Sequence, residues 1–501
     1  MSQQLSQETL AQLKTAQSSP NDELAKSFTQ SAVATTGLTA YDLEAPAKTL
    51  YPVLTPLRNE IPRVSGSGGI QANWKAVTKI NMNKAGIGIA EGARGQIIQT
   101  EVKDYFAAYK GIGLEDNVTF EAQYAGETFE DVKARAALGL LQSVMIGEEA
   151  CILGGNGGNG VDLTTPGTPT VVASASGGSL ATATLSVICI PMNLEAYMAA
   201  SVPLGLPVSG NKTMADGSVQ FYNSGTGAKS AAGTVAVTGP TGSATATVAG
   251  TAGAIAYGWF WGTAGNELLG AITTVNSVAI TAAAAGTQNA SAFTANWSKN
   301  GFLFDGLLSI AMNPAFGSYV VTQPTGTAGV GTPLTPDNKG GIVEIDQVLK
   351  YLWDNYRLSP TKIWVGAQEA SSITKAVLTT TNGSGSAPAF RFNIDVQQGL
   401  IAGSLNVSSY LNKFTMTGVK DIPIQIHPNM PNGTILFDTA SLPYQMSNVS
   451  NVRQIKTRQE YYQIEWPLRT RKYEFGVYAD EVLQHYFPPA MAVIRNVGPS
   501  A

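Results

Sequence analysis

The chain has 501 residues, of which 44% are hydrophobic and only 13% are charged. Its formal net charge of −4 comes without any run of Lys and Arg residues, which argues against strong electrostatic binding of nucleic acid. The length allows roughly two to four domains, and the low charge predicts a surface of Ser, Thr, Asn, Gln and Gly that suits a protein partly covered by neighbours.

Residues 1–63 are predicted to form an N-terminal arm. The first residues lack the charged start and apolar run of a secretory signal. Four prolines in residues 41–63 predict an extended segment that lies on another surface. No run of about 18 apolar residues is found, so we expect neither a transmembrane helix nor a membrane partner. Cys151 and Cys189 are expected to be reduced core residues.

Residues 64–110 are predicted to form a long two-stranded loop. Apolar and polar residues alternate from Gln71 to Met82, a glycine-rich tip follows, and a second alternating run returns. An isolated hairpin is only marginally stable, so this loop is expected to lie on a partner surface in another subunit. The candidate inter-subunit residues are Trp74, Lys75, Lys79, Lys84 and Arg94.

Residues 111–163 contain the clearest predicted helix, over 128–153. Thr128 and Asp131 form a start similar to a capping box, and apolar residues recur at helical spacing up to Gly154. A helix of this length would extend about 38 Å and act as a spine. The glycine-rich run at 154–160 lacks the Lys-Ser/Thr pair of a phosphate-binding loop, so it is interpreted as a flexible connector.

Residues 164–296 contain only five charged residues and read as a separate domain inserted into the first. Seven or eight short β-type runs with Gly, Ser and Asn turns predict an immunoglobulin-like β-sandwich. Tyr257, Trp259, Phe260 and Trp261 are concentrated in one of these runs. They are candidates for the core of this insert, because a sandwich poor in Leu and Ile needs large side chains. A carbohydrate-stacking platform is the alternative interpretation.

Residues 297–433 and 434–501 return to mixed composition, so the main body is predicted to be a discontinuous α+β fold. A helical pattern at 340–356 and a strand-then-helix pattern at 360–378 are followed by β-type runs after 434. His427 and His485 are expected to be structural, because neither lies in the context of a catalytic nucleophile. No metal-ligand spacing is present, so no enzyme, catalytic residue, cofactor or metal is expected. The charged run at 453–475 is interpreted as a solvated or subunit-facing strand, with nucleic acid as the alternative.

This order of arm, glycine-tipped loop, spine helix and α+β body resembles the major capsid protein of tailed bacteriophages, whose shell fold is shared with encapsulins. The segment FLFDGLLSIAMNPAFGSYV at 302–320 is similar to the segment that follows the spine helix in that family. The resemblance implies an extended loop at 64–110, a peripheral domain from 111–163 and 434–501, and an axial domain at 297–433. Residues 164–296 resemble the immunoglobulin-like or fibronectin-III-like insertions of some phage capsid proteins.

The resemblance implies a protein that self-assembles, as hexamers and pentamers, into the icosahedral shell of a virion in the host bacterial cytoplasm. The shell would enclose double-stranded DNA without sequence-specific binding, with separate scaffold, portal and decoration proteins as partners. Some family members crosslink through a loop lysine; Lys75, Lys79 and Lys84 qualify by position, but the absence of crosslinking is favoured. A glycan-binding adhesin with Trp259 and Trp261 as its platform, and an encapsulin-like compartment, are the alternatives.

Overall fold

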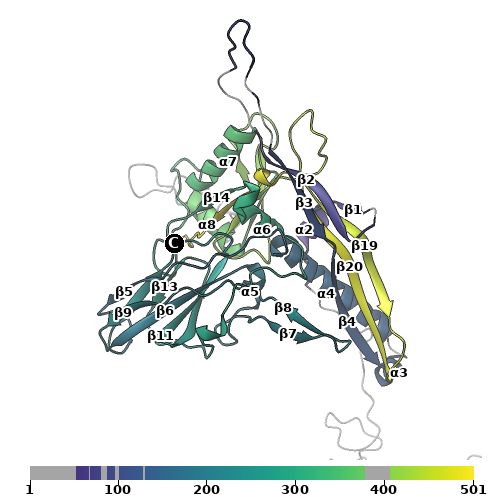
Figure 1. Ribbon diagram of the computed structural model, residues 1–501, viewed down its shortest axis with the longest axis horizontal. Helices are drawn as coiled ribbons and strands as arrows, with labels where there is room; N and C mark the ends of the chain where they lie inside the picture. Colours follow the sequence, from purple (N-terminus) through teal and green to yellow (C-terminus); the bar gives the residue numbers. More distant parts are fainter. Residues whose placement is uncertain are drawn as a thin grey trace, which may run out of the picture.

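The computed structural model describes the residues 52–66, 68–80, 87–95, 97, 101–127, 130–378 and 407–500. Most of the predicted arm, Lys84 and Thr128 therefore lie outside the described residues. Helices and strands are mixed along the whole chain, which confirms the predicted α+β class. Figure 1 shows a long sheet with the spine helix on one side, a second sheet with helices beside it, and the insert at the opposite corner.

The peripheral sheet has four strands in the order β1–β19–β20–β4, with β1 parallel to β19 and the other pairs antiparallel. Its strands are β1 (Arg63–Ser65), β4 (Lys110–Thr119), β19 (Arg453–Glu465) and β20 (Lys472–His485). Strands from residues 63–119, near the start of the described chain, thus pair with strands from residues 453–485, near its end. The spine helix α4 (Val132–Gly154) packs on this sheet, where Leu140 and Val144 contact the apolar side chains of Phe475 and Val477.

Helix α4 begins where the sequence predicts it, within a few residues. Asp131 is its N-cap and accepts hydrogen bonds from the backbone N–H groups of Lys133 and Ala134. The short helix α3 (Phe120–Gly126) precedes it. By length and composition alone, α4 is long and apolar enough to cross a membrane, which the sequence analysis did not expect. It also carries Glu148 and Glu149, which are buried against polar partners, as in a core helix.

The predicted long loop is an antiparallel hairpin of β2 (Gln71–Lys79) and β3 (Glu101–Ala108). The predicted alternation along β2 is present: Ala72, Ala76 and Thr78 are buried, and the residues between them are more exposed. Only Tyr109 separates β3 from β4, which pairs with β20. The returning arm therefore continues directly into the peripheral sheet.

The second sheet has six strands in the order β14–β21–β18–β15–β17–β16. Its strands are β14 (Tyr319–Thr322), β15 (Lys362–Val365), β16 (Ser409–Leu411), β17 (Asp421–Ile426), β18 (Ile435–Asp438) and β21 (Ala492–Arg495). The helices beside it are α6 (Leu307–Met312), α7 (Val343–Tyr356) and α8 (Ala367–Leu378). The apolar face of α7, with Ile345, Val348 and Leu352, packs in one core with residues of this sheet. Both predicted helices are thus present.

The insert contains two packed sheets, with strand orders β13–β10–β5 and β12–β11–β6–β9. Their strands are β5 (Thr170–Ser174), β6 (Ala183–Met192), β9 (Gly233–Val237), β10 (Ser243–Thr247), β11 (Ala256–Thr263), β12 (Asn266–Thr273) and β13 (Ser277–Ile280). A helix and a hairpin interrupt them, α5 (Leu194–Ala199) with β7 (Gly210–Thr213) and β8 (Val219–Tyr222). The remaining described α-helix is α2 (Pro56–Glu60). The 3-10 helices are η2 (Ala290–Ala292), η3 (Pro314–Phe316) and η4 (Pro488–Ala490).

Two chain segments, 154–163 and 297–306, run side by side and join the insert to the end of α4; we call them the neck. The buried Asn156 side chain donates hydrogen bonds to Val161 O (2.8 Å) and Ser298 O (2.7 Å). Gly306 allows the second neck segment to approach the end of α4 closely, because a Cβ at this position would lie only 2.6 Å from the carbonyl oxygen of Cys151. The insert also contacts β21, where Arg495 Nη1 donates to Thr251 O (2.5 Å). These contacts hold the insert at a defined place on the body.

Candidate functional site

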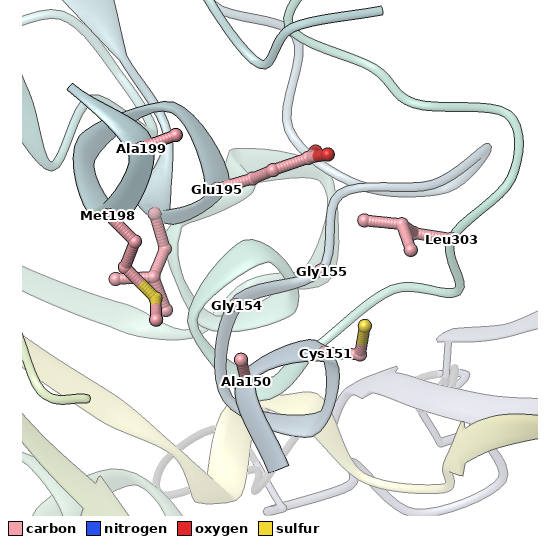
Figure 2. A pocket seen from close by; sticks show the side chains of 9 residues that line it. Ala150, Cys151, Gly154, Gly155, Glu195, Met198, Ala199 and Leu303 are labelled. Atoms are coloured by element: carbon pink, nitrogen blue, oxygen red, sulfur yellow. The ribbon is translucent and has the colours of Figure 1, made fainter. Parts of the chain in front are cut away.

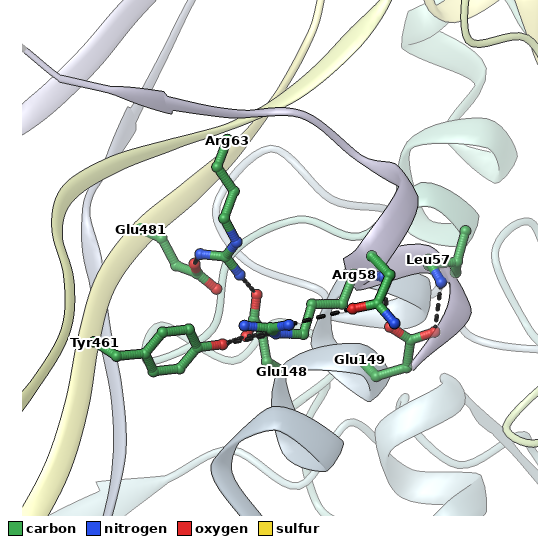
Figure 3. Close-up of polar contacts among 8 residues, drawn as sticks. Leu57, Arg58, Arg63, Glu148, Glu149, Tyr461 and Glu481 are labelled. Carbon is green, nitrogen blue, oxygen red and sulfur yellow. Dashed lines mark hydrogen bonds and ion pairs between the residues drawn. The ribbon is translucent and has the colours of Figure 1, made fainter. Parts of the chain in front are cut away.

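A largely buried group of four charged residues and one tyrosine joins the start of the described chain to the spine helix (Figure 3). We call it the arm–spine cluster. Its residues are Arg58, Arg63, Glu148, Tyr461 and Glu481. The Glu148 carboxylate is buried and accepts from Arg58 Nε (3.0 Å), the Arg63 guanidinium and the Tyr461 hydroxyl. Arg63 Nη1 also donates to Glu481 Oε2 (2.9 Å). One carboxylate on α4 thus ties together α2, β1, β19 and β20.

The neighbouring carboxylate, Glu149, caps helix α2. Its two oxygens accept from the backbone N–H groups of Leu57 (2.8 Å) and Arg58 (2.7 Å), a role that the Thr55 side chain does not fill. His427 Nε2 lies 2.7 Å from the same carboxylate. Because His427 Nδ1 accepts from the Asn429 N–H (3.1 Å), Nε2 carries the proton and donates to Glu149. His427 is therefore a buried structural residue.

The electrostatics of the arm–spine cluster reflect its burial. Burial raises the pKa of Glu481, and the charge of Arg63 opposes this shift. Burial also lowers the pKa of the Arg58 guanidinium, against the charges of Glu481 and Glu149. Removing Glu148 or Arg63 would break ion pairs in a largely buried site, so the cluster favours the state in which its segments are together.

Sequence reasoning did not identify Glu148 and Glu149 as important. The available signal was their position: two adjacent carboxylates in the otherwise apolar run VMIGEEACIL of a helix. Glu is almost never fully buried unless it is paired, so such a pair predicts partners from elsewhere in the chain. Those partners lie between 85 and 313 positions away, as Arg63 and Tyr461 show for Glu148, and the sequence alone does not name them.

The glycine-rich run at 154–160 is a connector, but the structure does not agree with the prediction that it is flexible. Residues 154–157 are buried, and the loop wraps around the Asp305 carboxylate, which accepts from the Asn159 N–H (3.1 Å). The backbone N–H groups of Gly157 and Gly160 also favour the charged form of Asp305, while burial raises its pKa. The loop therefore surrounds a carboxyl group that belongs to the chain itself.

A second buried charge group lies at the start of β19. Arg453 is 1% exposed and pairs with Asp438 and with Glu60 Oε1 (3.1 Å). His485 lies opposite Arg453 on β20, and burial together with the Arg453 charge lowers the pKa of its imidazole to about 3. His485 is therefore neutral near pH 7. Much of the charge in the 453–475 run is thus paired within the chain, as Arg458 with Asp480 (2.5 Å) also illustrates.

Trp74 lies at the base of the hairpin and packs on its own chain. Its indole N–H donates to His485 O (3.1 Å), and its ring stacks on Tyr105 at 6.2 Å between centroids. Tyr105 in turn stacks on Phe316 at 4.9 Å. The hairpin is therefore anchored at its base by aromatic contacts, and a role for Trp74 between subunits stays a prediction.

The other predicted loop residues lie further from the base. Lys75 and Lys79 are exposed and make cross-strand ion pairs with Asp104 (3.7 Å) and Glu101 (3.5 Å). Arg94 is exposed and makes no ion pair with the described residues, and Lys84 lies outside them. The described part of the tip presents three isoleucines to solvent, Ile87 (78% exposed), Ile89 (58%) and Ile97 (88%). Contacts of these residues with another subunit remain a prediction.

The four candidate aromatic residues of the insert are all on β11 and all buried, with exposures of 0–6%. Tyr257, Trp259 and Trp261 face the space between the two sheets, while Phe260 points to the opposite side and packs on Phe293. Their polar atoms have partners inside the chain: the two indole N–H groups donate to Thr273 Oγ1 (2.8 Å) and Ala282 O (3.0 Å). A sugar cannot stack on side chains that are covered in this way.

Within the described ranges, no group of three or more His, Cys, Asp or Glu side chains is arranged to hold a metal ion. Cys151 and Cys189 are free thiols, and burial raises the pKa of Cys151 to about 12, so it is a poor nucleophile near neutral pH.

No protein-family model and no curated protein match the chain. Among solved structures, it is similar to a chain from the capsid of a native GTA particle, with 9% identity and a TM-score of 0.42 over 94% of this chain and 99% of that one. A chain of the cyanophage A-1(L) capsid has 10% identity and a TM-score of 0.42, covering 91% and 97%. A virus-like particle from Pyrococcus furiosus has 6% identity and a TM-score of 0.32, covering 88% and 91%. These similar structures include phage capsids, the class that the order of elements indicated.

Proposed function

We propose that the chain is the major capsid protein of a tailed bacteriophage, and that it self-assembles into the icosahedral shell enclosing the DNA genome. The observation that carries the proposal is the β2–β3 hairpin. Its base is anchored on the body by Trp74, Tyr105 and Phe316, while its tip extends from the molecule with Ile87, Ile89 and Ile97 exposed (Figure 1). Contiguous exposed apolar residues typically mark an interaction site.

The arm–spine cluster supports the same proposal. A subunit that transmits contacts through a shell needs a stiff connection between its N-terminal region, its spine helix and its outer sheet. Arg58, Arg63 and Glu148 supply this connection through paired, largely buried charges. We infer that hexamers and pentamers are the units of assembly, in the host bacterial cytoplasm, with separate scaffold, portal and decoration proteins as partners.

The small net charge supports the proposal that the shell encloses double-stranded DNA without recognising a particular base sequence. The formal net charge is −4, and two of the basic residues of β19, Arg453 and Arg458, are paired with carboxylates. Sequence-independent binding to DNA rests on unpaired Lys and Arg residues, which would be a disadvantage for packaging and release.

The test is negative-stain electron microscopy of the full-length protein, alone and co-expressed with its scaffold protein. Closed shells or ring-shaped capsomers are the expected result. A uniform monomer or dimer under every condition would overturn the proposal. Nuclease-protected DNA inside native particles distinguishes a phage shell from an encapsulin-like compartment, which would contain a cargo enzyme.

A further inference from the structure

A groove lies at the neck of the insert, between the C-terminal end of α4 and helix α5 (Figure 2). It has a volume of about 270 Å³, and its walls are mainly apolar, with Ala150, Met198 and Leu303 among them. Met198 is 50% exposed and the neighbouring Phe302 is 40% exposed. We call this surface the neck groove. It is formed partly by the insert and partly by the spine helix.

One charged side chain, Glu195, lies in the neck groove. Figure 2 shows its carboxylate extending from α5 toward Leu303. Oε1 accepts from Asn300 Nδ2 (2.8 Å), while Oε2 is buried and has no hydrogen-bond partner among the described residues. The nearby Lys212 lies over the Tyr222 ring at 4.2 Å and forms no ion pair with Glu195 in the described part of the chain. Burial raises the pKa of Glu195, while the hydrogen bond from Asn300 and the charge of Lys212 oppose this shift.

The tip of the β2–β3 hairpin has the complementary composition. It presents the exposed apolar side chains of Ile87 and Ile89 together with the exposed guanidinium of Arg94, which makes no ion pair with described residues. Among the described residues, an apolar groove with an unpartnered carboxylate oxygen matches an apolar tip whose guanidinium forms no ion pair. Arginine binds carboxylates well in such partly desolvated sites, because its donors form a planar fork.

The tip cannot reach the groove of its own subunit. The base of the hairpin is fixed on the body by Trp74, and in Figure 1 the tip extends at the top of the view, away from α5 in the lower part. A protrusion and a receptor on different parts of one chain produce a head-to-tail contact, which closes into rings when the rotation allows. The occupant is therefore a second copy of this chain.

We propose that the hairpin tip of one subunit docks in the neck groove of the next, with Ile87 and Ile89 against the apolar wall and Arg94 on the Glu195 carboxylate. This inference rests on the proposed function as a shell protein and adds the receptor surface to it. The insert then has a role in assembly, because helix α5 and half of the neck belong to the segment that interrupts the body. A shell built in this way links each subunit to its neighbour through the insert.

Disulfide trapping tests the contact directly. The variant carries Ile89→Cys and Met198→Cys, and assembled particles are oxidised and run on a denaturing gel without reductant. We expect a ladder of linked chains. Each single variant controls for the buried native thiols, and Ile89→Cys with Val172→Cys is the matched control, because Val172 is 60% exposed on the far sheet of the insert.

The outcomes separate the two proposals. Particles without the Ile89–Met198 ladder, or with an equal ladder from the Val172 control, would overturn the docking site and leave the shell function standing. Failure of the parent protein to assemble under any condition would overturn both. A ladder specific to Met198 supports the site.

The charge pair has its own test, which measures the critical protein concentration for assembly by light scattering. Arg94→Gln and Glu195→Gln are each expected to raise this concentration about tenfold, the change typical when a hydrogen bond between charged groups is lost. The double variant is expected to be no worse than either single variant, because both remove the same contact. Glu195→Gln keeps an acceptor for Asn300, and near-UV circular dichroism checks that it folds. Additive effects, or no effect, would contradict the pairing.

Discussion

The arm–spine cluster and the core of the insert use opposite means to hold their strands together. The cluster places Arg58, Arg63 and Glu148 in a largely buried site and joins segments up to about 400 positions apart, as the 403 positions between Arg58 and Tyr461 show. The core of the insert is filled by Tyr257, Trp259 and Trp261 among small apolar residues from neighbouring strands.

The difference follows from what each region must specify. Charge pairs are directional and costly to separate, so they select one partner among many distant segments. Aromatic side chains fill volume, each burying about 150–250 Å², and they suffice where all the strands belong to one continuous segment of the chain. The cluster therefore mainly selects which segments pack together, whereas the aromatic residues of the insert mainly fill the space between its sheets.

Glu148→Ala is expected to have the largest effect. It removes the shared acceptor of two arginines and a tyrosine, so that Arg58 and Arg63 each lose an ion pair in a largely buried site. Breaking a buried pair typically costs about 3–5 kcal/mol of unfolding free energy, and we expect the upper end of this range. Urea unfolding of the full-length, unassembled subunit measures it. Glu148→Gln, which keeps the hydrogen-bond acceptor, is the control. A loss below about 1 kcal/mol for the alanine variant would contradict a structural role for the cluster.

Trp259→Ala tests how much the aromatic core of the insert contributes to stability. Trp259 is fully buried, and truncating such a side chain leaves a cavity that costs about 3–5 kcal/mol. Because the insert has its own core, we expect this loss to appear in the insert first, as early hydrogen exchange in β6, β11 and β12. Phe221→Ala, at a side chain that is 54% exposed, is the control and should change stability little. Equal destabilisation of the peripheral sheet would show that the two cores are coupled.

His485 predicts how the second charge group responds to pH. Its pKa is lowered to about 3 in the folded chain, against about 6.5 in an unfolded one. Between these values the unfolded state binds one more proton, so stability falls as the pH drops from about 6.5 toward 3, by up to about 1.4 kcal/mol per pH unit. His485→Leu removes this contribution and should flatten the pH dependence of the unfolding free energy over that window. The same slope in the variant and the parent would show that His485 does not titrate in this way.

Lys79→Ala is expected to have the smallest effect on the isolated subunit. Lys79 is 65% exposed and its distance to Glu101 is 3.5 Å, a geometry that typically contributes about 0–1 kcal/mol. The melting temperature of the unassembled subunit should therefore be unchanged within error. Lys75→Ala, at the similar pair with Asp104, is the parallel variant. A clear loss of stability from either variant would mean that exposed ion pairs, as well as buried ones, stabilise the folded subunit.

The elements that the sequence predicted well are those with a strong local pattern. The helical spacing and Asp131 cap predicted α4, the alternation along 71–79 predicted β2, and the short β-type runs of the insert correspond to β5, β6 and β8–β13. Helix α5 and strand β7 were not predicted, because their segments are short and contain few periodic apolar residues. The predicted domain boundaries and the inter-subunit residues stay predictions.

The sequence by itself determined the α+β class, the spine helix and the concentration of aromatic residues on one strand, because these depend on periodicity and composition over a few turns or strands. Only the tertiary structure decided that Glu148 binds Arg58 and Arg63, that Asp305 lies within the glycine-rich loop, and that α4 and α5 form a groove. The physical reason is that such contacts join residues far apart in the chain. Local spacing carries no information about which distant strand or helix will pack beside a given side chain.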